Sequence, residues 1–422
     1  MRRLVAAGVA GGLIAVSLPA GVAAADGWRH HGRGTTWTVQ PGQSIQAAVD
    51  RARSGDTIRI AAGTYEEAVC VRGKGLTIKG AGRDRTVITW PEWSSVADLP
   101  AVPSSGPAAE GCWAEQERVD NEDDPTTLAD NVSALHFVDP DAPVVVKDLG
   151  TRNHPANGVV AWGARGFEVK DTRGVGHERY GILAAYSERV SVKGNVEEGV
   201  VRSAPVSGGT AGISVGDSER AGATVSGNTV RGYNIGVFAR ESRGGTIRDN
   251  RISGNCVGVL VFDDSATEIP DTTGHVVGGD WSVRSNRVAD NTRYCLVGRD
   301  GSQRVSGTGI AVTNADHVTV TGNTLTGNRP VVPAGQAPTN FPSGGVALIS
   351  FAPPPGTNPP GAELPGLVEF VTVKGNVFRD NAPTDISVSE PTPYAPLVLG
   401  PGEGIVVEGN RCTTSSPAGL CS

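Results

Sequence analysis

The chain has 422 residues, of which 38% are hydrophobic and 5% are aromatic, and its formal net charge at pH 7 is −7. This acidic balance excludes wholesale binding to nucleic acid, which needs a basic surface. Met1 is the single methionine, so the mature chain can have no thioether ligand for copper.

Residues 1–25 have the pattern of a cleaved secretory signal peptide. A basic pair, Arg2 and Arg3, precedes an apolar run that ends at about Leu18, and alanines at 23–25 offer a cleavage site. The run is short for a membrane span, and no later stretch reaches about 18 unbroken apolar residues. We therefore expect a secreted, extracellular protein that uses the Sec route and has no membrane span.

The mature chain begins with a segment at 26–37 that we expect to be flexible, followed by one domain at 38–422. The start of this domain predicts a short amphipathic helix at 44–54. Ser44 is a good N-cap, and Gly55 is a typical stop signal.

A short phrase recurs through the domain, with a β-branched residue three positions before an Asn. Its asparagines are Asn195, Asn228, Asn250, Asn286, Asn323, Asn376 and Asn410, and degenerate copies lie at 76–81, 144–149 and 167–172. A second phrase, Gly followed by Ile or Val, lies 14 residues before Asn250 and again 8 residues after it. The shortest period is therefore 22 residues.

This period predicts a stack of strands, with one coil per repeat. The alternation of a β-branched residue with Ser or Thr is the inward and outward pattern of a strand. A single repeat cannot bury its apolar face alone, so the repeats stack into a solenoid. Asn and Gly tolerate the left-handed conformation that sharp corners need.

The same stacking predicts hydrogen bonds between equivalent Asn side chains, because neighbouring coils lie about 4.8 Å apart. A second column of asparagines, five residues further on, strengthens this interpretation. It contains Asn255, Asn291, Asn328 and Asn381.

The segment PGQSIQAAVDRARSGDTIRIAAGTYEEAV, together with the Asn and Gly phrases, carries a family resemblance. Over roughly 38–412 the chain resembles the pectin-lyase-like right-handed parallel β-helix superfamily, and more narrowly its carbohydrate-binding and NosD-like repeat proteins. The resemblance implies an all-β fold: a single-stranded right-handed parallel β-helix of about ten coils, with the helix at 44–54 as its N-terminal cap. This superfold carries lyases, hydrolases, epimerases, esterases and non-catalytic adhesins, so the resemblance implies an architecture more than an activity.

The largest interruption of the repeats is an acidic insertion at 93–134, which we expect to be a loop. Proline-rich stretches further along the chain cannot extend a sheet, so they also predict loops. Loops on a rigid scaffold are common places for function.

Six cysteines in an exported chain predict disulfides. Cys256 lies six residues after Asn250 and Cys295 nine residues after Asn286, so the two should occupy nearly equivalent corners of adjacent coils. The pairs that we predict are Cys70–Cys112, Cys256–Cys295 and Cys412–Cys421, the last closing the C-terminal tail over the final coil.

One column of the repeat is basic. Two residues before the corner Asn, or its equivalent, stand Lys79, Lys147, Lys170, Lys193, Arg248, Arg284 and Lys374, which include five of the six lysines of the chain. Like charges stacked at about 4.8 Å are unfavourable unless solvent or an anion relieves them. The functional hypothesis is that Lys147, Lys170, Lys193, Arg248 and Arg284 bind an acidic polysaccharide. The alternative is a solvated strand end that discourages sideways aggregation.

A second column is acidic and lies five residues after the Gly phrase. It contains Asp217, Glu241 and Asp263, with Asp264 beside the last. Paired carboxylates about 5–9.5 Å apart are what glycoside hydrolysis needs, and a lyase could use them to hold Ca²⁺ over a uronate while an Arg or Lys abstracts the proton. The alternative is that they are ordinary turn residues, as Asn314 in the same column suggests.

Comparison with the polygalacturonases of the superfamily limits this hypothesis. Asp263-Asp264 resembles their paired-Asp motif, but the accompanying Gly-His-Gly and Arg-Ile-Lys motifs are absent. His177, at another corner, is a candidate general acid or base, or else a corner histidine. The acidic cluster at 120–124 could bind Ca²⁺ but lacks ligand spacing.

The leading hypothesis is a secreted, monomeric protein that binds an extracellular polysaccharide and could cleave it as a lyase or a glycoside hydrolase. The alternative is a non-catalytic cell-surface, adhesion or structural module. A NosD-like role in metal maturation is disfavoured, because the mature chain has no Met.

Overall fold

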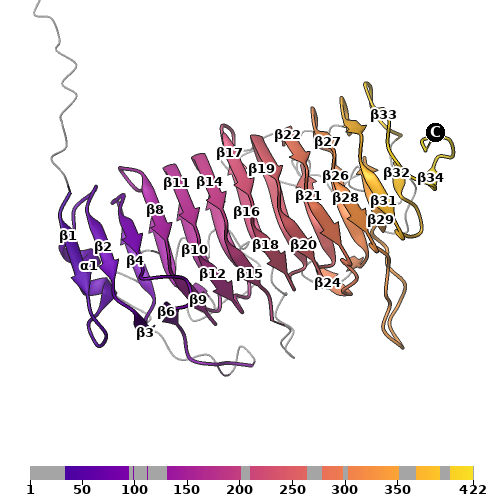
Figure 1. Ribbon diagram of the computed structural model, residues 1–422. Coiled ribbons are helices and arrows are strands. Elements are labelled where there is room, and N and C mark those ends of the chain that lie inside the picture. The colour runs from indigo at the N-terminus through magenta and orange to yellow at the C-terminus, as the bar shows by residue number, and fades with distance from the viewer. Residues whose placement is uncertain are drawn as a thin grey trace, which may run out of the picture. The chain divides into compact units, whose positions relative to one another are not determined.

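The computed structural model describes residues 34–94, 98, 112, 131–200, 210–263, 278–297, 303–350, 367–389 and 400–421. They lie in one compact unit of the chain. In that unit the strands follow one another in chain order along a stack of coils (Figure 1). Each coil contributes strands to three parallel sheets, here named A, B and C.

The bounds of the strands are as follows. Sheet A contains β1 (Thr36–Val39), β2 (Thr57–Ile60), β5 (Thr77–Lys79), β8 (Val144–Lys147), β11 (Arg165–Lys170), β14 (Glu188–Lys193), β17 (Ala223–Ser226), β19 (Ile235–Arg248), β22 (Gly279–Arg284), β27 (Thr319–Thr321), β30 (Thr372–Lys374) and β33 (Val406–Glu408). Sheet B contains β3 (Gly63–Glu66), β6 (Thr86–Thr89), β9 (Gly150–Arg152), β12 (Arg173–Val175), β15 (Val196–Glu198), β18 (Thr229–Arg231), β20 (Arg251–Ser253), β23 (Arg287–Ala289), β28 (Thr324–Thr326) and β31 (Val377–Arg379). Sheet C contains β4 (Val69–Arg72), β7 (Leu135–Val138), β10 (Asn157–Trp162), β13 (Tyr180–Ala185), β16 (Ala211–Ser218), the first half of β19, β21 (Val257–Phe262), β26 (Thr308–Thr313), β29 (Gly344–Ile349), β32 (Ile386–Val388) and β34 (Ser415–Ser416).

The chain passes from sheet A to sheet B to sheet C and then returns to A one coil further on. Val225 pairs in parallel with Val192 before it and with Ile247 after it, at equivalent positions of neighbouring coils. β19 runs through the corner between C and A without a break, so it joins these two sheets. Sheet B has ten strands among the described residues, in agreement with the predicted stack of about ten coils. A small antiparallel hairpin, β24 (Cys295–Val297) and β25 (Gln303–Val305), lies outside the three sheets.

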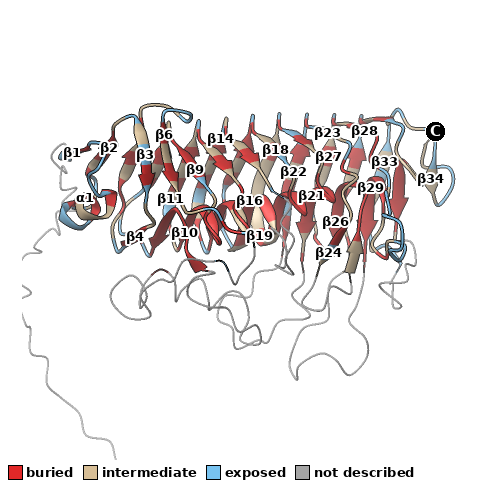
Figure 2. Ribbon diagram, turned by 90° about the horizontal axis from the view of Figure 1, so that it is seen from below, coloured by how far each residue is buried: buried red, intermediate tan, exposed pale blue. Residues whose placement is uncertain are grey.

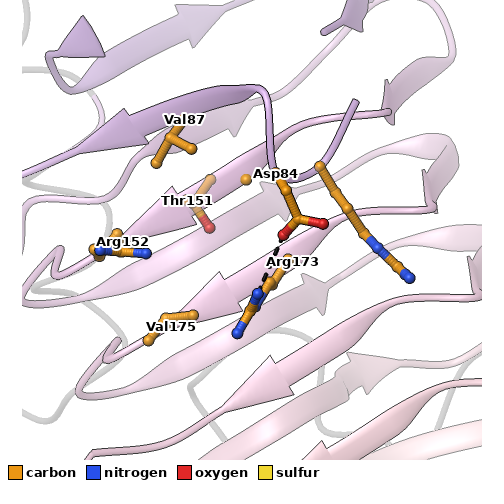
Figure 3. A pocket seen from close by; sticks show the side chains of 8 residues that line it. Asp84, Val87, Thr151, Arg152, Arg173 and Val175 are labelled. Carbon is orange, nitrogen blue, oxygen red and sulfur yellow. Dashed lines mark hydrogen bonds and ion pairs between the residues drawn. The ribbon is translucent and has the colours of Figure 1, made fainter. Parts of the chain in front are cut away.

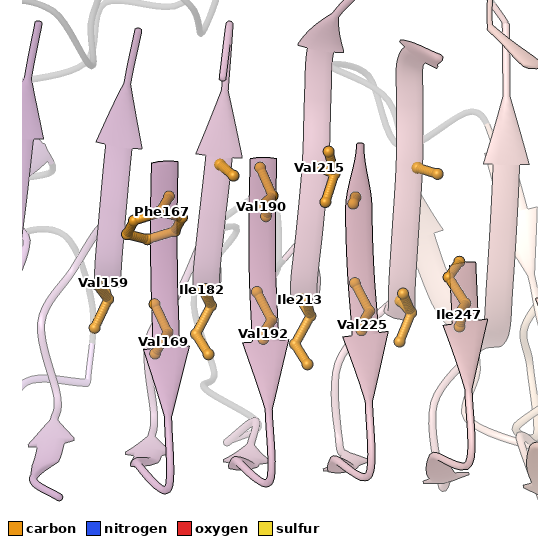
Figure 4. Close-up of a cluster of buried hydrophobic side chains, with 14 of the residues drawn as sticks. Val159, Phe167, Val169, Ile182, Val190, Val192, Ile213, Val215, Val225 and Ile247 are labelled. Carbon is orange, nitrogen blue, oxygen red and sulfur yellow. The ribbon is translucent and has the colours of Figure 1, made fainter. Parts of the chain in front are cut away.

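The inner faces of the three sheets form one apolar core. Val169, Val192 and Val225 of sheet A are fully buried, and Figure 4 shows them in a row that faces Val159 and Ile182 of sheet C. Figure 2 shows buried residues in every part of the stack. A fully buried Val or Ile contributes about 1.5–3 kcal/mol relative to an exposed one. The predicted β-branched column is therefore the core of sheet A.

Asparagine side chains form a continuous ladder at the corner between sheets A and B. Nδ2 of Asn250 donates to Oδ1 of Asn286 (2.9 Å) and to the carbonyl of Val225 (3.0 Å). Equivalent contacts link Asn195, Asn228, Asn250, Asn286, Asn323, Asn376 and Asn410. A second ladder at the corner between B and C links Asn255, Asn291, Asn328 and Asn381. Both predicted ladders are confirmed.

The left-handed residue of the A–B corner is the one before the ladder Asn. Gly194, Gly227 and Asp249 have φ of 71°, 65° and 57°, whereas the asparagines that follow them, Asn195, Asn228 and Asn250, are not left-handed. The expectation that Asn itself takes this conformation is therefore wrong for the ladder positions. The Asn amide must point into the corner to make its hydrogen bonds, so the turn falls to the preceding Gly or Asp, which also tolerate it.

The N-terminal helix is α1 (Ile45–Arg51), which is shorter than the predicted 44–54. The Ser44 hydroxyl accepts from the backbone N–H of Ala47 (3.0 Å), as expected of an N-cap. The helix ends early because the Asp56 carboxylate accepts from the backbone N–H of Arg53 (2.9 Å).

Asp56 also anchors the first strand, through the backbone N–H of Thr35 (2.7 Å) and Nε1 of Trp37 (2.9 Å). Because β1 pairs with β2 from Thr36 onward, the sheet begins two residues before the expected domain start at 38.

The three predicted disulfides are confirmed. Their Cα–Cα distances are 5.7 Å for Cys70–Cys112, 6.1 Å for Cys256–Cys295 and 5.3 Å for Cys412–Cys421. Within the described part of the chain, no helix has the length and apolar character to cross a membrane.

Candidate functional site

The basic column forms a stripe at the end of sheet A. Lys79, Lys147, Lys170 and Lys193 are direct partners on four consecutive coils. The column is interrupted at Ser226 and at Thr321. The whole basic stripe consists of Lys79, Lys147, Lys170, Lys193, Arg248, Arg284 and Lys374. Adjacent strands lie about 4.8 Å apart, so these four lysines present cations at a short and regular spacing.

Some cations of the stripe have acidic neighbours at the same corner. Lys170 Nζ lies 3.8 Å from Asp171 and Arg248 Nη1 lies 2.7 Å from Asp249. The Lys170 and Arg248 side chains are 45% and 36% exposed, and exposed pairs of this kind contribute about 0–1 kcal/mol. Within the described residues, Lys147 has no ion pair. The stripe therefore remains available to an anion.

A cavity of about 430 Å³ lies at the N-terminal end of the stripe. It is lined by Arg59, Lys79 and Arg85, with Asp148 as its acidic residue. Arg59 is the direct strand partner of Lys79. The cavity therefore extends the positive surface beyond Lys79, the first lysine of the stripe.

The predicted carboxylate column lies at the corner between sheets C and A. Asp217 and Glu241 occupy equivalent positions, because the residues on both sides of them are paired. The backbone N–H of Asp263 donates to the carbonyl of Thr313 (3.0 Å), which places Asp263 in the same column. Asp264 lies outside the described residues.

The geometry of this column is that of a corner. Asp217 and Glu241 are left-handed, with φ of 49° and 45°. Glu241 and Asp263 are 1% and 2% exposed, and the Asp263 carboxylate accepts from the backbone N–H of Gly278 (3.0 Å). These features are expected of turn residues. A catalytic role for the column stays a prediction.

Asp217 is held by an arginine that the sequence analysis did not single out. Arg240 Nη1 lies 3.1 Å from Asp217 Oδ1, and the two side chains are 25% and 13% exposed. Burial raises the pKa of the nearby Tyr180, with Arg240 opposing the shift and Asp217 adding to it. The phenol of Tyr180 is therefore protonated at neutral pH, so it can donate a hydrogen bond but is not a ready base.

His177 is a corner histidine, the second of the two alternatives considered. It is 2% exposed, its Nε2 lies 2.9 Å from Oγ1 of Thr151, and its ring centroid is 5.7 Å from that of His154. Such an enclosed imidazole does not reach a polymer on the outer surface.

A calcium site is not assembled in the part of the chain that the structure describes. No group of three or more His, Cys, Asp or Glu residues there is placed to hold a metal ion. The acidic cluster at 120–124 and Asp264 lie outside that part, so Ca²⁺ binding stays a prediction.

The comparisons with known proteins agree with this architecture. Residues 157–350 match the family model described as "Right handed beta helix region". This region is a right-handed parallel β-helix. The predicted resemblance to such proteins is confirmed.

Several solved structures are similar to the β-helix. The A-module of the Azotobacter vinelandii mannuronan C-5 epimerase AlgE4 is 14% identical, with 88% of this chain and 94% of that chain covered and a TM-score of 0.47. A mutant of the periplasmic alginate epimerase AlgG is 12% identical, with 89% and 72% covered and a TM-score of 0.47. The catalytic domain of a GH87 alpha-1,3-glucanase in complex with nigerose is 12% identical, with 90% and 69% covered and a TM-score of 0.42. No curated protein matches the chain.

The outer face of sheet B carries arginines that the sequence analysis missed. They are Arg152, Arg173, Arg231, Arg251, Arg287 and Arg379. On the sheet B strands from β9 to β31, Glu198 is the one acidic residue on the outer face. The neighbouring Glu197 points into the β-helix and is 1% exposed. A signal was present in the sequence, because four of these arginines recur one or three residues after a ladder Asn. Arg152 and Arg173 keep the same spacing from Leu149 and Thr172, which stand at the ladder position.

Proposed function

We propose that this protein binds an extracellular acidic polysaccharide along the basic stripe. The observation that carries the proposal is the register of Lys79, Lys147, Lys170 and Lys193 on consecutive coils. A polymer with regularly spaced carboxylates or sulfates can meet several of these cations at once, whereas a small anion needs only one or two. The three disulfides support an oxidising, extracellular location.

The electrostatics of the stripe support a salt-sensitive interaction. Lysines stacked side by side repel one another, and an anionic chain relieves this repulsion. Acidic neighbours such as Asp171 and Asp249 compete for the cations, but exposed pairs are weak. Since exposed charges are screened beyond about 8–10 Å at moderate ionic strength, binding should weaken as salt rises.

Binding without cleavage is the better-supported form of this proposal. A catalytic acid or base must come within about 3 Å of the atom that it protonates or deprotonates. Glu241 and Asp263 are buried at a corner, and Asp217 is paired with Arg240. The alternative is a lyase or hydrolase that uses Asp263 and Asp264.

A matched pair of triple variants tests the binding site. The first variant changes Lys147, Lys170 and Lys193 to Ala. The control variant changes Arg251, Arg287 and Arg379 to Ala, so it loses the same charge from sheet B. Affinities for polygalacturonate and alginate are measured at low and high salt, with dextran as the neutral glycan. We expect the lysine variant to lose about tenfold or more in affinity, which corresponds to about 1.4 kcal/mol, and the control to bind as the parent does. Equal losses in the two variants would reduce the proposal to a general charge effect.

An assay of turnover decides between binding and cleavage. The parent is incubated with the same polysaccharides, and reducing ends and unsaturated products are measured. We expect neither to accumulate. If the parent does form product, and Asp263→Asn with Asp264→Asn abolishes it, the enzymatic alternative is correct.

A further inference from the structure

The corner between β5 and β6 is larger than the other A–B corners and is held firmly. Six residues, 80–85, separate these two strands, whereas Gly194 and Asn195 alone separate β14 and β15. The Thr86 hydroxyl accepts from the backbone N–H of Ala81 (2.9 Å), and the backbone N–H of Gly82 donates to the Asp148 carbonyl (2.8 Å). The loop therefore stands as a fixed wall beside sheet B.

A cavity of about 260 Å³ lies between this loop and strands β9 and β12. Its charged lining consists of three arginines, Arg83, Arg152 and Arg173, and one carboxylate, Asp84. Figure 3 shows Asp84 above Arg173, with Arg152 on the neighbouring strand. The lining therefore has an excess of two positive charges.

Arg173 is fixed by the acidic residues beside it. Its guanidinium lies 3.1 Å from Asp84 Oδ1 and 3.3 Å from Glu198 Oε1. Glu198 is shared with Arg231 (3.1 Å). These contacts hold the Arg173 guanidinium in a fixed position on the wall of the cavity.

Arg83 and Arg152 have no carboxylate partner among the described residues. Nη1 of Arg83 donates to the carbonyl of Gly194 (3.4 Å), which holds this side chain over the coils that follow. Arg152 is exposed. In a chain with a formal charge of −7, two such arginines on one cavity are not explained by the ion-pair network of Arg173.

The chemistry and the size of the cavity indicate its ligand. Guanidinium groups match the oxygen pairs of carboxylate, sulfate and phosphate groups and can bind them in a bidentate way. Pockets for drug-sized ligands have about 300–1,000 Å³, so this smaller cavity suits a single charged sugar rather than an oligosaccharide. Gly150 and Thr151 also line the cavity, but the Thr151 hydroxyl lies 2.9 Å from Nε2 of the buried His177, so recognition of a ligand depends on the arginines.

We propose that the cavity lined by Arg83, Arg152 and Arg173 is a second anion site, which takes the carboxylate, sulfate or phosphate group of one acidic sugar. The site lies on sheet B and does not depend on the basic stripe of sheet A. The sugar comes either free in solution or as the end of a polymer.

A titration of the full mature protein with galacturonate tests this site. Binding is measured by calorimetry and by backbone amide chemical shifts, and glucose is the neutral control. Arg152→Ala is the informative variant, because Arg152 is exposed and unpaired and its loss should leave the fold intact. Arg379 lies in the same column of sheet B and also lacks an ion pair within the described residues, so Arg379→Ala is the matched control. We expect galacturonate to bind the parent, Arg152→Ala to lose about tenfold in affinity, and Arg379→Ala to match the parent.

Two further variants separate the possible explanations. Arg152→Lys keeps the charge but not the planar fork, so its affinity should lie between those of the parent and Arg152→Ala. The triple lysine variant of the stripe should bind galacturonate as the parent does, even if polysaccharide binding is lost or was never present. The proposal is overturned if galacturonate does not bind, if glucose binds equally well, or if Arg152→Ala and Arg379→Ala have the same effect.

Short oligogalacturonates identify the source of the sugar. Equal affinity for the monosaccharide and the oligomers supports a site for free acidic sugars. Tighter binding of the oligomers that is lost in Arg152→Ala supports a site for a polymer end.

Discussion

Asn250 and Asn286 are joined by two hydrogen bonds that end on one oxygen. Oδ1 of Asn286 accepts from Nδ2 of Asn250 (2.9 Å) and from its backbone N–H (3.0 Å). Both residues are 1% exposed, so water cannot replace these contacts. The side-chain oxygen of each ladder Asn therefore accepts hydrogen bonds from the Asn on the coil before it. The backbone and side-chain N–H groups of the same Asn donate to the Asn on the coil after it.

Removing an Asn from the middle of the ladder should destabilise the fold strongly. Asn286→Ala leaves the backbone N–H and side chain of Asn250 and the carbonyl of Ile247 without their buried partner. We expect a loss of about 3 kcal/mol in the free energy of unfolding, measured by urea denaturation. Asn410→Ala, at the partly exposed end of the ladder, should lose less than about 1 kcal/mol, because water can reach that corner. Equal losses at the two positions would contradict the ladder as the source of the effect.

Buried histidines should make the fold sensitive to acid. Burial lowers the pKa of His136 to about 3, with a further contribution from Arg72, and burial lowers that of His154 to about 4. An unfolded His titrates near 6.5, so the unfolded state takes up protons first as the pH falls. The contribution of these residues to the free energy of unfolding is therefore complete above pH 6.5 and is lost as the pH falls towards their folded pKa values. At pH 5 the loss is about 2 kcal/mol per histidine.

Unfolding by urea at pH 7 and pH 5 checks this expectation. His154→Gln should show a smaller difference between the two pH values than the parent, whereas the exposed His317→Gln should show the same difference. A parent stability that does not change between pH 7 and pH 5 would rule out the proposed protonation.

Glu197 should destabilise the fold at alkaline pH. It is 1% exposed, and its Oε2 has no hydrogen-bond partner within the described residues. Burial raises its pKa well above the ordinary value, and Glu198 adds to the shift. A raised folded pKa means that its stabilising contribution is complete below about pH 4.5 and is lost as the pH rises through the folded pKa.

The isosteric change Glu197→Gln removes this titration. We expect the variant to melt at a higher temperature than the parent at pH 8, with a difference that shrinks towards pH 5. Each unit of pKa shift corresponds to about 1.4 kcal/mol. Glu198→Gln is the control, since it loses the partly exposed pairs with Arg173 and Arg231 and should be slightly less stable at both pH values. A gain in the Glu197 variant that is the same at both pH values would point to packing instead of charge.

The disulfide Cys412–Cys421 should stabilise the C-terminal coil. Its sequence separation is 9 residues, for which loop-closure entropy predicts about 2–3 kcal/mol. We expect Cys412→Ser with Cys421→Ser to lower the unfolding free energy by that amount, or to expose the last coil first in hydrogen exchange. Unchanged stability and unchanged exchange at 406–421 would contradict this expectation.

The sequence by itself determined the coil and its two ladders. A β-branched column three residues before each Asn and a shortest period of 22 residues leave few arrangements other than stacked parallel strands, because strand alternation and corner chemistry are local properties. The basic stripe was predictable for the same reason, since its members keep a constant distance from the corner. The disulfide Cys256–Cys295 also followed from spacing along the coils, because its two cysteines were expected at nearly equivalent corners.

The tertiary structure alone decided which charged groups are buried and which meet. Asp217 and Glu241 look alike in the repeat, yet one pairs with Arg240 and the other is enclosed. The cavity of Arg83, Arg152 and Arg173 joins an enlarged corner to strands of later coils. The period predicts the position of a residue within its coil, but burial and ion pairing depend on neighbouring coils and on corners of unequal length, which the period does not specify.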